Sequence, residues 1–365
     1  MRLEHLALTD FRNYVELELE PQPGLNVFIG PNAQGKSNLL EAIAVLGVGK
    51  SFRGARDGEM IRAGAERAVV RGRSALARDA IEIACSIVKS ERGVRKAFSR
   101  SGRTVPFGRF LGTLPVVTFV PSDLRLIDGP PSLRRAFLNT ALAQRDAGYY
   151  RALSQYQAAL RQKNAVLRGE NADGELLAVY DRVLVENGAR LTIARRSFVG
   201  ELEGEAQRAH ALWSGGERLA LRYVPDVPTG AEGEETARTS LARRLRELAP
   251  IERLRRTSLA GPHRDDLEVR IDGRPLHAFG SQGQCRTAVL AVKVAEYTVM
   301  RNACGEAPLL LLDDVLSELD EHRAGAFLAG VGDYEQAYVT ATHRPQALPE
   351  GSALFSIDAA RVCRG

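Results

Sequence analysis

The stretch NVFIGPNAQGKSN, residues 26–38, decides the fold. It places Gly30, Gly35, Lys36 and Ser37 in the spacing G-x-x-x-x-G-K-S/T of a phosphate-binding loop. The apolar run LNVFI before the loop predicts a buried strand, and LLEAIAVL after it carries apolar residues at helical spacing. A strand, this loop and a helix in that order are the context such a loop needs, so we predict an α/β nucleotide-binding fold.

The residue types of the loop fit the chemistry of phosphate binding. Glycines let backbone N–H groups approach phosphate oxygens, and the following helix points its positive end at them. Lys36 can reach the β- and γ-phosphates of ATP, and the Ser37 hydroxyl can ligate Mg²⁺. The sequence therefore predicts ATP and Mg²⁺ as cofactors, with the nucleotide-binding residues Gly30, Pro31, Asn32, Ala33, Gln34, Gly35, Lys36 and Ser37.

The acidic partner of this loop is PLLLLDDVLSELD, residues 308–320. Four leucines directly precede Asp313, as in a central parallel strand that ends at the site. We expect Asp313 to hold Mg²⁺, directly or through water, and Asp314 to orient or deprotonate the attacking water. The structural alternative is a buried strand followed by an acidic helix N-terminus, and the phosphate loop is what favours the catalytic interpretation.

Two serine-glycine segments compete for the role of the loop that contacts a partner's nucleotide. The first, LWSGGERLAL at residues 212–221, contains Ser-Gly-Gly-Glu. After it, Leu219, Leu221 and Tyr223 alternate with Arg218, Ala220 and Arg222, which predicts a turn entering a strand. We expect no helix there to direct its N–H groups at a phosphate.

The second segment, GSQGQCRTAVLAVKVAEYTVM, carries the signals of a capped helix. Ser281 and Gln284 form an S-x-x-Q capping box, and apolar residues continue at helical spacing. Gly283 leaves the backbone of the first turn uncovered, which suits a γ-phosphate. An ordinary capped core helix is the alternative. The other two motifs favour a nucleotide contact by Ser281, Gln282, Gly283 and Gln284.

The composition is that of an ordinary globular protein. The 365 residues are 44% hydrophobic and 26% charged, and the net charge of +5 permits a polyanionic partner without requiring one. The N-terminal segment carries Glu4 and Asp10 where a signal peptide needs its apolar run, so we expect a cytoplasmic protein. The four cysteines form no C-x-x-C pair, and no apolar run reaches the length of a transmembrane helix.

The pattern along the chain predicts two lobes. Short strand-like runs occupy much of the first part, and long helical patterns rich in Ala, Leu, Arg and Gln follow. Helix and strand signals alternate again near the C-terminus, where LEVRIDGRPLHAF predicts a hairpin turning at Asp272 and Gly273. We expect an ATPase lobe built from residues 1–120 and 257–365, a mainly helical lobe inserted at 121–256, and no long coiled coil.

Taken together, GPNAQGKSN, SQGQ and LLLLDDVLSELD resemble the ABC-type ATPase heads of the SMC group. The resemblance sharpens to the bacterial RecF family on FVPSDLRLIDGPPSLRRAFLN (119–139), SLAGPHRDDL (258–267) and GKSFRGARD (49–57). The matching segments span nearly the whole chain.

The resemblance implies a function as well as a fold. It implies an ATP-dependent homodimer in which Ser281–Gln284 of one subunit complete the site built on Lys36 of the other. It also implies a DNA replication and repair protein that binds single-stranded DNA and gapped or junction duplexes. Such a protein works with RecR and RecO to place RecA on single-stranded DNA.

The resemblance also assigns roles to single residues. It implies that Ser317 and Asp320 lie at the dimer interface and that His343 acts as a catalytic switch near the γ-phosphate. Asp314 stands where many ABC proteins carry a glutamate. A shorter side chain holds the attacking water farther away, so the resemblance implies slow turnover.

The alternative is the ATPase subunit of a membrane transporter. Ser281 follows Lys36 by 245 positions, more than the small helical subdomain of a transporter subunit needs. A metabolic kinase, the third option, would not explain the capped SQGQ helix. The basic residues of the inserted helices suit phosphate contacts, although solvated helix faces carry similar charge: Arg134, Arg135, Arg145, Arg151, Arg161, Lys163 and Arg168.

Overall fold

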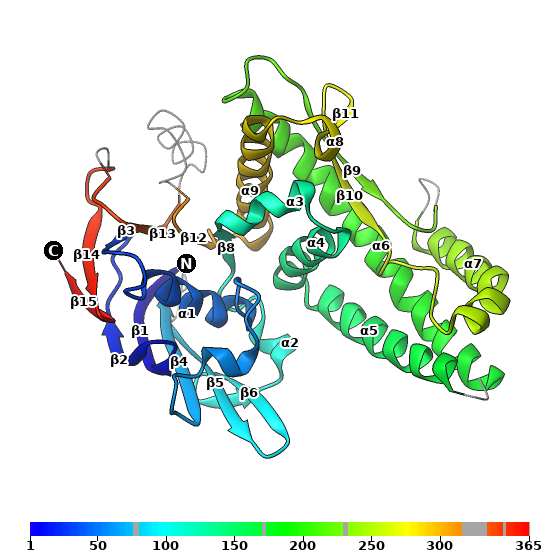
Figure 1. The fold of residues 1–365 in the computed structure, drawn as a ribbon, viewed down its shortest axis with the longest axis horizontal. Coiled ribbons are helices and arrows are strands. Elements are labelled where there is room, and N and C mark those ends of the chain that lie inside the picture. Colours follow the sequence, from blue (N-terminus) through cyan, green and yellow to red (C-terminus); the bar gives the residue numbers. More distant parts are fainter. Residues whose placement is uncertain (76–79, 170–172, 229–232, 316–333, 346–347, 365) are drawn as a thin grey trace. The chain divides into compact units, whose positions relative to one another are not determined.

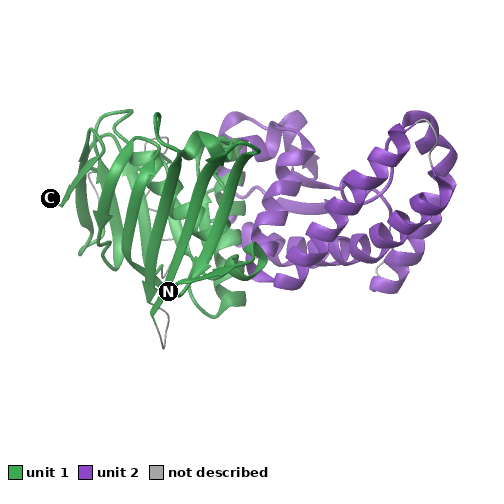
Figure 2. Cartoon of the chain, turned by 90° about the horizontal axis from the view of Figure 1, so that it is seen from below, with its two compact units in different colours: residues 1–124, 212–214, 289–365 green, residues 125–211, 215–288 purple. Residues whose placement is uncertain are grey.

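The computed structural model describes residues 1–75, 80–169, 173–228, 233–315, 334–345 and 348–364. The chain divides into two compact units, unit 1 (1–124, 212–214 and 289–365) and unit 2 (125–211 and 215–288), which Figure 2 colours separately. In the sequence, most of unit 2 lies between the two larger parts of unit 1. It reaches residue 288, beyond the expected end at 256, because the strand after residue 257 pairs with a strand that precedes it in this unit.

Unit 1 contains an antiparallel sheet with the strand order β2-β1-β4-β5-β6-β7 (Figure 1). The strands alternate buried and exposed side chains, as in a sheet with one face on a core. The sheet consists of β1 (Arg2–Phe11), β2 (Tyr14–Leu19), β4 (Arg67–Ala75), β5 (Ala80–Ser90), β6 (Gly93–Arg100) and β7 (Arg103–Val105).

The second sheet of unit 1 has the order β15-β14-β3-β13-β12-β8 and is parallel except for β15. The carboxyl ends of parallel strands meet at one edge, so the residues that follow β3, β12 and β13 come together there. Its strands are β3 (Gly24–Ile29), β8 (Val116–Phe119), β12 (Leu309–Leu312), β13 (Gln336–Ala341), β14 (Ala353–Asp358) and β15 (Arg361–Arg364).

Helix α1 (Lys36–Val48) belongs to the hydrophobic core of unit 1. Its residues from Leu39 to Leu46 are fully buried, and they share one apolar cluster with side chains from both sheets. A helix that is buried on all sides cannot shift without disturbing that cluster, so the core fixes the position of the helix N-terminus. Unit 1 also contains α2 (Phe107–Phe110) and the short 3₁₀ helices Asp57–Met60 and Pro121–Leu124.

Unit 2 is mainly helical and includes a small sheet of order β11-β10-β9. The predicted hairpin is confirmed, with Asp272 and Gly273 at φ 49° and 76° between β10 and β11. In the described part of the chain, no helix is both long and apolar enough to span a membrane. The elements are α3 (Arg125–Asp128), α4 (Pro131–Arg145), α5 (Ala147–Arg168), α6 (Gly174–Ala211), β9 (Leu219–Val224), α7 (Glu234–Arg255), β10 (Asp266–Ile271), β11 (Arg274–Pro275), α8 (Leu276–Phe279) and the first part of α9 (Gln282–Cys304), which continues into unit 1.

Four of the seven basic residues expected to suit DNA contacts make contacts inside unit 2. Lys163 Nζ lies 2.6 Å from carboxylate oxygens of both Asp181 and Glu252, and its side chain is 1% exposed. Arg145 pairs with Glu201, and Arg135 donates to the backbone carbonyl of residue 265. Lys163 and Arg135 are held in buried or half-buried contacts, whereas Arg145 remains exposed despite its ion pair. The exposed members of the set are therefore Arg145, Arg151, Arg161 and Arg168.

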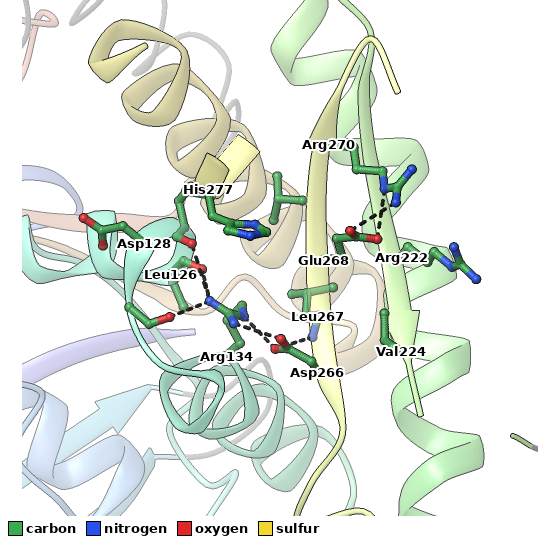
Figure 3. Close-up of a pocket in the computed structure, with 13 residues that line it drawn as sticks. Leu126, Asp128, Arg134, Arg222, Val224, Asp266, Leu267, Glu268, Arg270 and His277 are labelled. Carbon is green, nitrogen blue, oxygen red and sulfur yellow. Dashed lines mark hydrogen bonds and ion pairs between the residues drawn. The ribbon is translucent and has the colours of Figure 1, made fainter. Parts of the chain in front are cut away.

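Arg134 is the fourth of these residues and lines a cavity of about 460 Å³ in unit 2, shown in Figure 3. Its guanidinium binds both carboxylate oxygens of Asp266 at 2.6 and 2.9 Å and donates to the Gly129 carbonyl at 2.8 Å. Across the cavity, Arg270 pairs with Glu268. The Arg134–Asp266 ion pair therefore links α4 to β10, and the charges of both Arg134 and Arg270 are compensated by carboxylates within the cavity.

Candidate nucleotide-binding site

The phosphate-binding loop runs from Gly30 to Gly35, between β3 and α1. A Cβ atom at Gly30 would lie 2.2 Å from the backbone oxygen of Ile357 in β14, so only glycine fits. Gly35 has a φ of 118°, and a Cβ there would lie 2.8 Å from the Asn13 amide nitrogen. Both glycines are therefore required by the backbone path, and the second begins the helix whose N–H groups point into the loop.

Gln34 is held by the turn between β14 and β15. The Ala359 N–H donates to Gln34 Oε1 at 2.7 Å, and the Ala360 N–H donates to the Gln34 carbonyl at 3.1 Å. Both alanines have positive φ, 46° and 62°, a conformation that favours glycine. The side chain and the backbone carbonyl of Gln34 thus both anchor the loop to the C-terminal hairpin.

Lys36 is the first residue of α1. Its Nζ donates to the carbonyls of Gly30 at 2.6 Å and Pro31 at 2.8 Å, so the ammonium lies across the loop. Burial lowers the pKa of Lys36, and the carboxylates of Asp313 and Asp314 oppose that change. The loop therefore combines a cationic side chain with a helix N-terminus, which suits a polyphosphate.

Asp313 follows β12 and lies beside Ser37, to which it is hydrogen-bonded. Thr340 Oγ1 of β13 donates to Asp313 Oδ1 at 2.9 Å. Asp313 is 8% exposed, and burial raises its pKa while the two hydroxyl groups oppose the rise. A hydroxyl and a carboxylate oxygen side by side are hard ligands of the kind that fit Mg²⁺.

Asp314 adopts the left-handed conformation, with φ 54°. Its N–H donates to Thr340 Oγ1 at 2.8 Å. Left-handed backbone costs a non-glycine residue roughly 1 kcal/mol, so the surrounding contacts must impose it.

The other predicted catalytic residue, His343, is exposed and lies two residues beyond β13. Because β13 lies between β3 and β12, His343 emerges at the strand edge that carries the loop and Asp313. Arg53 also faces this region. Its Nη1 donates to Asn38 Oδ1 at 3.0 Å, and its charge acts to lower the pKa of Asp313.

The capping box predicted at Ser281 is present in unit 2. The Ser281 N–H donates to Gln284 Oε1 at 2.8 Å, and the Gln284 N–H donates to Ser281 Oγ at 3.2 Å. Ser281, Gln282 and Gly283 are exposed, and a Cβ at Gly283 would meet only Ser281 Oγ, at 3.9 Å. Gly283 is therefore not required for packing within the described chain, and the first turn of α9 is open.

The sequence does not predict two residues that interact with Asp313, nor one contact of the Ser-Gly-Gly-Glu segment. Thr340 and Arg53 carry no local signal, because their partners lie 27 and 15 residues away in the chain. LWSGGERLAL forms a turn into β9, as predicted, yet its Glu217 reaches the capping glutamine. Ser317 and Asp320 lie outside the described residues.

Comparisons with known proteins show which family the chain resembles. The RecF/RecN/SMC N terminal domain model matches residues 2–363. The chain is 41% identical to the DNA replication and repair protein RecF of Symbiobacterium thermophilum, over 99% of this chain and 98% of the relative. It is 39% identical to RecF of Gloeobacter violaceus, over 94% of this chain and 92% of the relative.

The chain belongs to the RecF family. A solved structure of a RecF protein with ATP, described as a recombination mediator in the RecFOR pathway, superimposes with a TM-score of 0.92 at 32% identity, covering 100% of this chain and 97% of that one. An SMC head bound to a winged-helix domain of ScpA shares the fold at a TM-score of 0.58 and 15% identity. The predicted SMC-type head is thus confirmed, and nothing supports the transporter alternative.

Proposed function

We propose that this RecF family member is an ATP-controlled DNA-binding protein of replication and recombinational repair. The proposal rests on one observation: the groups suited to bind a nucleotide lie on two separate surfaces of the chain. Unit 1 supplies the loop, Lys36 and the Ser37–Asp313 pair, whereas unit 2 presents the open, capped helix start at Ser281. A helix start whose first residues are exposed suits a phosphate brought by a second copy.

In this proposal, ATP acts as the switch for dimerisation. Ser281, Gln282, Gly283 and Gln284 of one subunit complete the site built on Lys36 and Ser37 of the other. Mg²⁺ is held by Ser37 and Asp313, and its charge helps to bind and orient the phosphates. Asp314 orients the attacking water and His343 contacts the γ-phosphate. ATP adds interface and hydrolysis removes it, so the dimer lasts as long as the nucleotide.

We further propose that DNA contacts the basic edge, defined as residues 89–109 around β6 and β7. Lys89 and Lys96 form ion pairs with Glu66 and Asp57, respectively. The exposed arginines of the edge form no ion pair with any residue that the structure describes. β6 extends over roughly 25 Å, enough to follow several phosphates along a backbone. These arginines are Arg92, Arg95, Arg100, Arg103 and Arg109.

The partners follow from the family rather than from the geometry. The related structures are described as recombination mediators in the RecFOR pathway. We therefore propose that the chain binds single-stranded DNA and gapped or junction duplexes, engages RecR, and with RecO helps to place RecA on single-stranded DNA.

The rate at which the protein releases DNA tests this function. A labelled gapped duplex is bound by the full chain with Mg²⁺ and either ATP or ADP, and its release is timed after adding unlabelled competitor. The proposal expects at least tenfold slower release with ATP, since a dimer contacts the backbone twice. Equal release rates with the two nucleotides would refute ATP control of DNA binding.

A further inference from the structure

The Ser-Gly-Gly-Glu turn has a defined position beside the start of α9. The Arg218 N–H donates to Asp272 Oδ1 at 2.9 Å, and the Asp272 N–H donates to the Arg218 carbonyl at 3.0 Å. Leu219, the next residue, begins the pairing of β9 with Ile271 of β10. The backbone at Glu217 is therefore fixed by the hairpin of the small sheet, entirely within unit 2.

From this position Glu217 reaches the capping glutamine. Gln284 Nε2 donates to Glu217 Oε1 at 2.7 Å, across 67 residues of sequence. An ionised carboxylate can only accept hydrogen bonds, so it selects the rotation of the Gln284 amide that presents its NH₂ group. The amide oxygen then points at the Ser281 N–H, which it accepts at 2.8 Å.

The opposite amide rotation would break the capping box. It would place the Gln284 NH₂ group against the Ser281 N–H, two donors facing each other, and its oxygen against the Glu217 carboxylate. Glu217 thus favours the one arrangement in which Gln284 caps the helix and the Ser281 Oγ accepts from the Gln284 N–H. The proton of the Ser281 hydroxyl is then left to donate outward.

We infer that Glu217 is a positioning residue for nucleotide-dependent dimerisation, acting through Gln284 on the surface that receives the second copy's γ-phosphate. The inference rests on the proposed ATP-dependent dimer. A carboxylate near a phosphate-binding surface is electrostatically unfavourable by itself. Its contribution is therefore orientation, and a neutral acceptor at the same position should replace it.

The test measures the dimerisation constant of the full chain with ATP and Mg²⁺, from mass against protein concentration. Glu217→Ala should weaken dimerisation by about tenfold or more, the loss expected when a hydrogen bond to a charged group is removed. Glu217→Gln should remain within about threefold of the natural protein, because an amide oxygen can still accept from Gln284. Glu235→Ala, at an exposed carboxylate on α7, is the matched control.

A second pair of variants separates orientation from packing. Gln284→Glu alone places two carboxylates against each other and should weaken dimerisation more than Glu217→Ala does. Adding Glu217→Gln to Gln284→Glu restores one donor and one acceptor and should recover at least part of the loss. Thermal unfolding and monomer nucleotide affinity identify any variant that fails to fold.

The outcomes distinguish this inference from the proposed function. If Ser281→Arg abolishes dimerisation but Glu217→Ala dimerises like the natural protein, the inference is overturned and the dimer survives. If Glu217→Gln is as impaired as Glu217→Ala, or the paired exchange recovers nothing, Glu217 acts by charge or packing and the inference is wrong. If Ser281→Arg dimerises normally, the proposed function itself fails.

Discussion

Thr340 Oγ1 donates a hydrogen bond to Asp313 Oδ1 at 2.9 Å and accepts one from the Asp314 N–H at 2.8 Å. One hydroxyl group on β13 therefore orients the carboxylate that we propose binds Mg²⁺, and it fixes the left-handed turn that follows. This links the strand next to the phosphate loop with the strand that carries the acidic pair.

Replacing Thr340 with valine keeps the shape of the side chain and removes both hydrogen bonds. We expect a loss of about 1–3 kcal/mol in the free energy of unfolding, because Asp313 and the Asp314 N–H lose a buried partner. We also expect weaker Mg²⁺-dependent ATP binding. Denaturant unfolding and a Mg²⁺ titration measure the two effects. Thr340→Ser should restore both, and a valine variant with natural Mg²⁺ dependence would contradict the assigned role.

Lys36→Met should reduce ATP affinity on the order of a hundredfold, because it removes the only ammonium that crosses the described loop. Equilibrium binding of a fluorescent ATP analogue measures the effect. Arg246→Met, which removes an exposed charge from α7, is the control and should bind ATP as the natural protein does. Natural affinity in the Lys36 variant would show that the phosphates bind elsewhere.

Asp314→Asn should slow hydrolysis at least tenfold and prolong the ATP dimer, since the amide cannot accept a proton from water. The natural protein should itself turn over slowly, because the aspartate side chain reaches less far than a glutamate. Steady-state phosphate release and dimer lifetime measure both statements. Unchanged hydrolysis in Asp314→Asn would remove this residue as the water-orienting group, and natural turnover of tens per second would refute slow catalysis.

The basic edge predicts a salt-dependent DNA effect. The double variant Arg95→Ala with Arg103→Ala should weaken DNA binding uniformly across sequences. It should also make the fall of log affinity with log salt shallower, by about 2 in slope. Arg151→Ala with Arg161→Ala on α5 is the matched comparison and should change the slope less. A larger effect from the α5 pair would place the DNA contact on the inserted helices, as the sequence pattern alone suggested.

Much of this site was predictable from spacing. The phosphate loop, the acidic strand and the capped helix each occupy a short continuous stretch, so strand and helix periodicity identify them without tertiary information. The sequence also favours SQGQ over Ser-Gly-Gly-Glu as the nucleotide-contacting segment, because the alternation after residue 217 predicts a strand rather than a helix. The structure confirms the capping box at Ser281 and the strand that begins at Leu219.

The rest depends on contacts between distant residues. Nothing near Thr340 indicates that its hydroxyl bridges Asp313 and Asp314, and nothing near Glu217 indicates a partner on α9. The sequence pattern likewise does not show which partner an arginine binds. Arg134 looks like a solvent-facing helix residue in the sequence, yet it joins α4 to β10.

The measurement that tests the central claim most directly is the molecular mass of the full chain in solution, with and without ATP and Mg²⁺. We expect a monomer without nucleotide and a dimer with ATP and Mg²⁺, which Ser281→Arg abolishes while ATP binding persists. A mass that does not respond to nucleotide would contradict the sandwich of Ser281 on the partner's ATP. It would leave the phosphate loop as a binding site without the proposed switch.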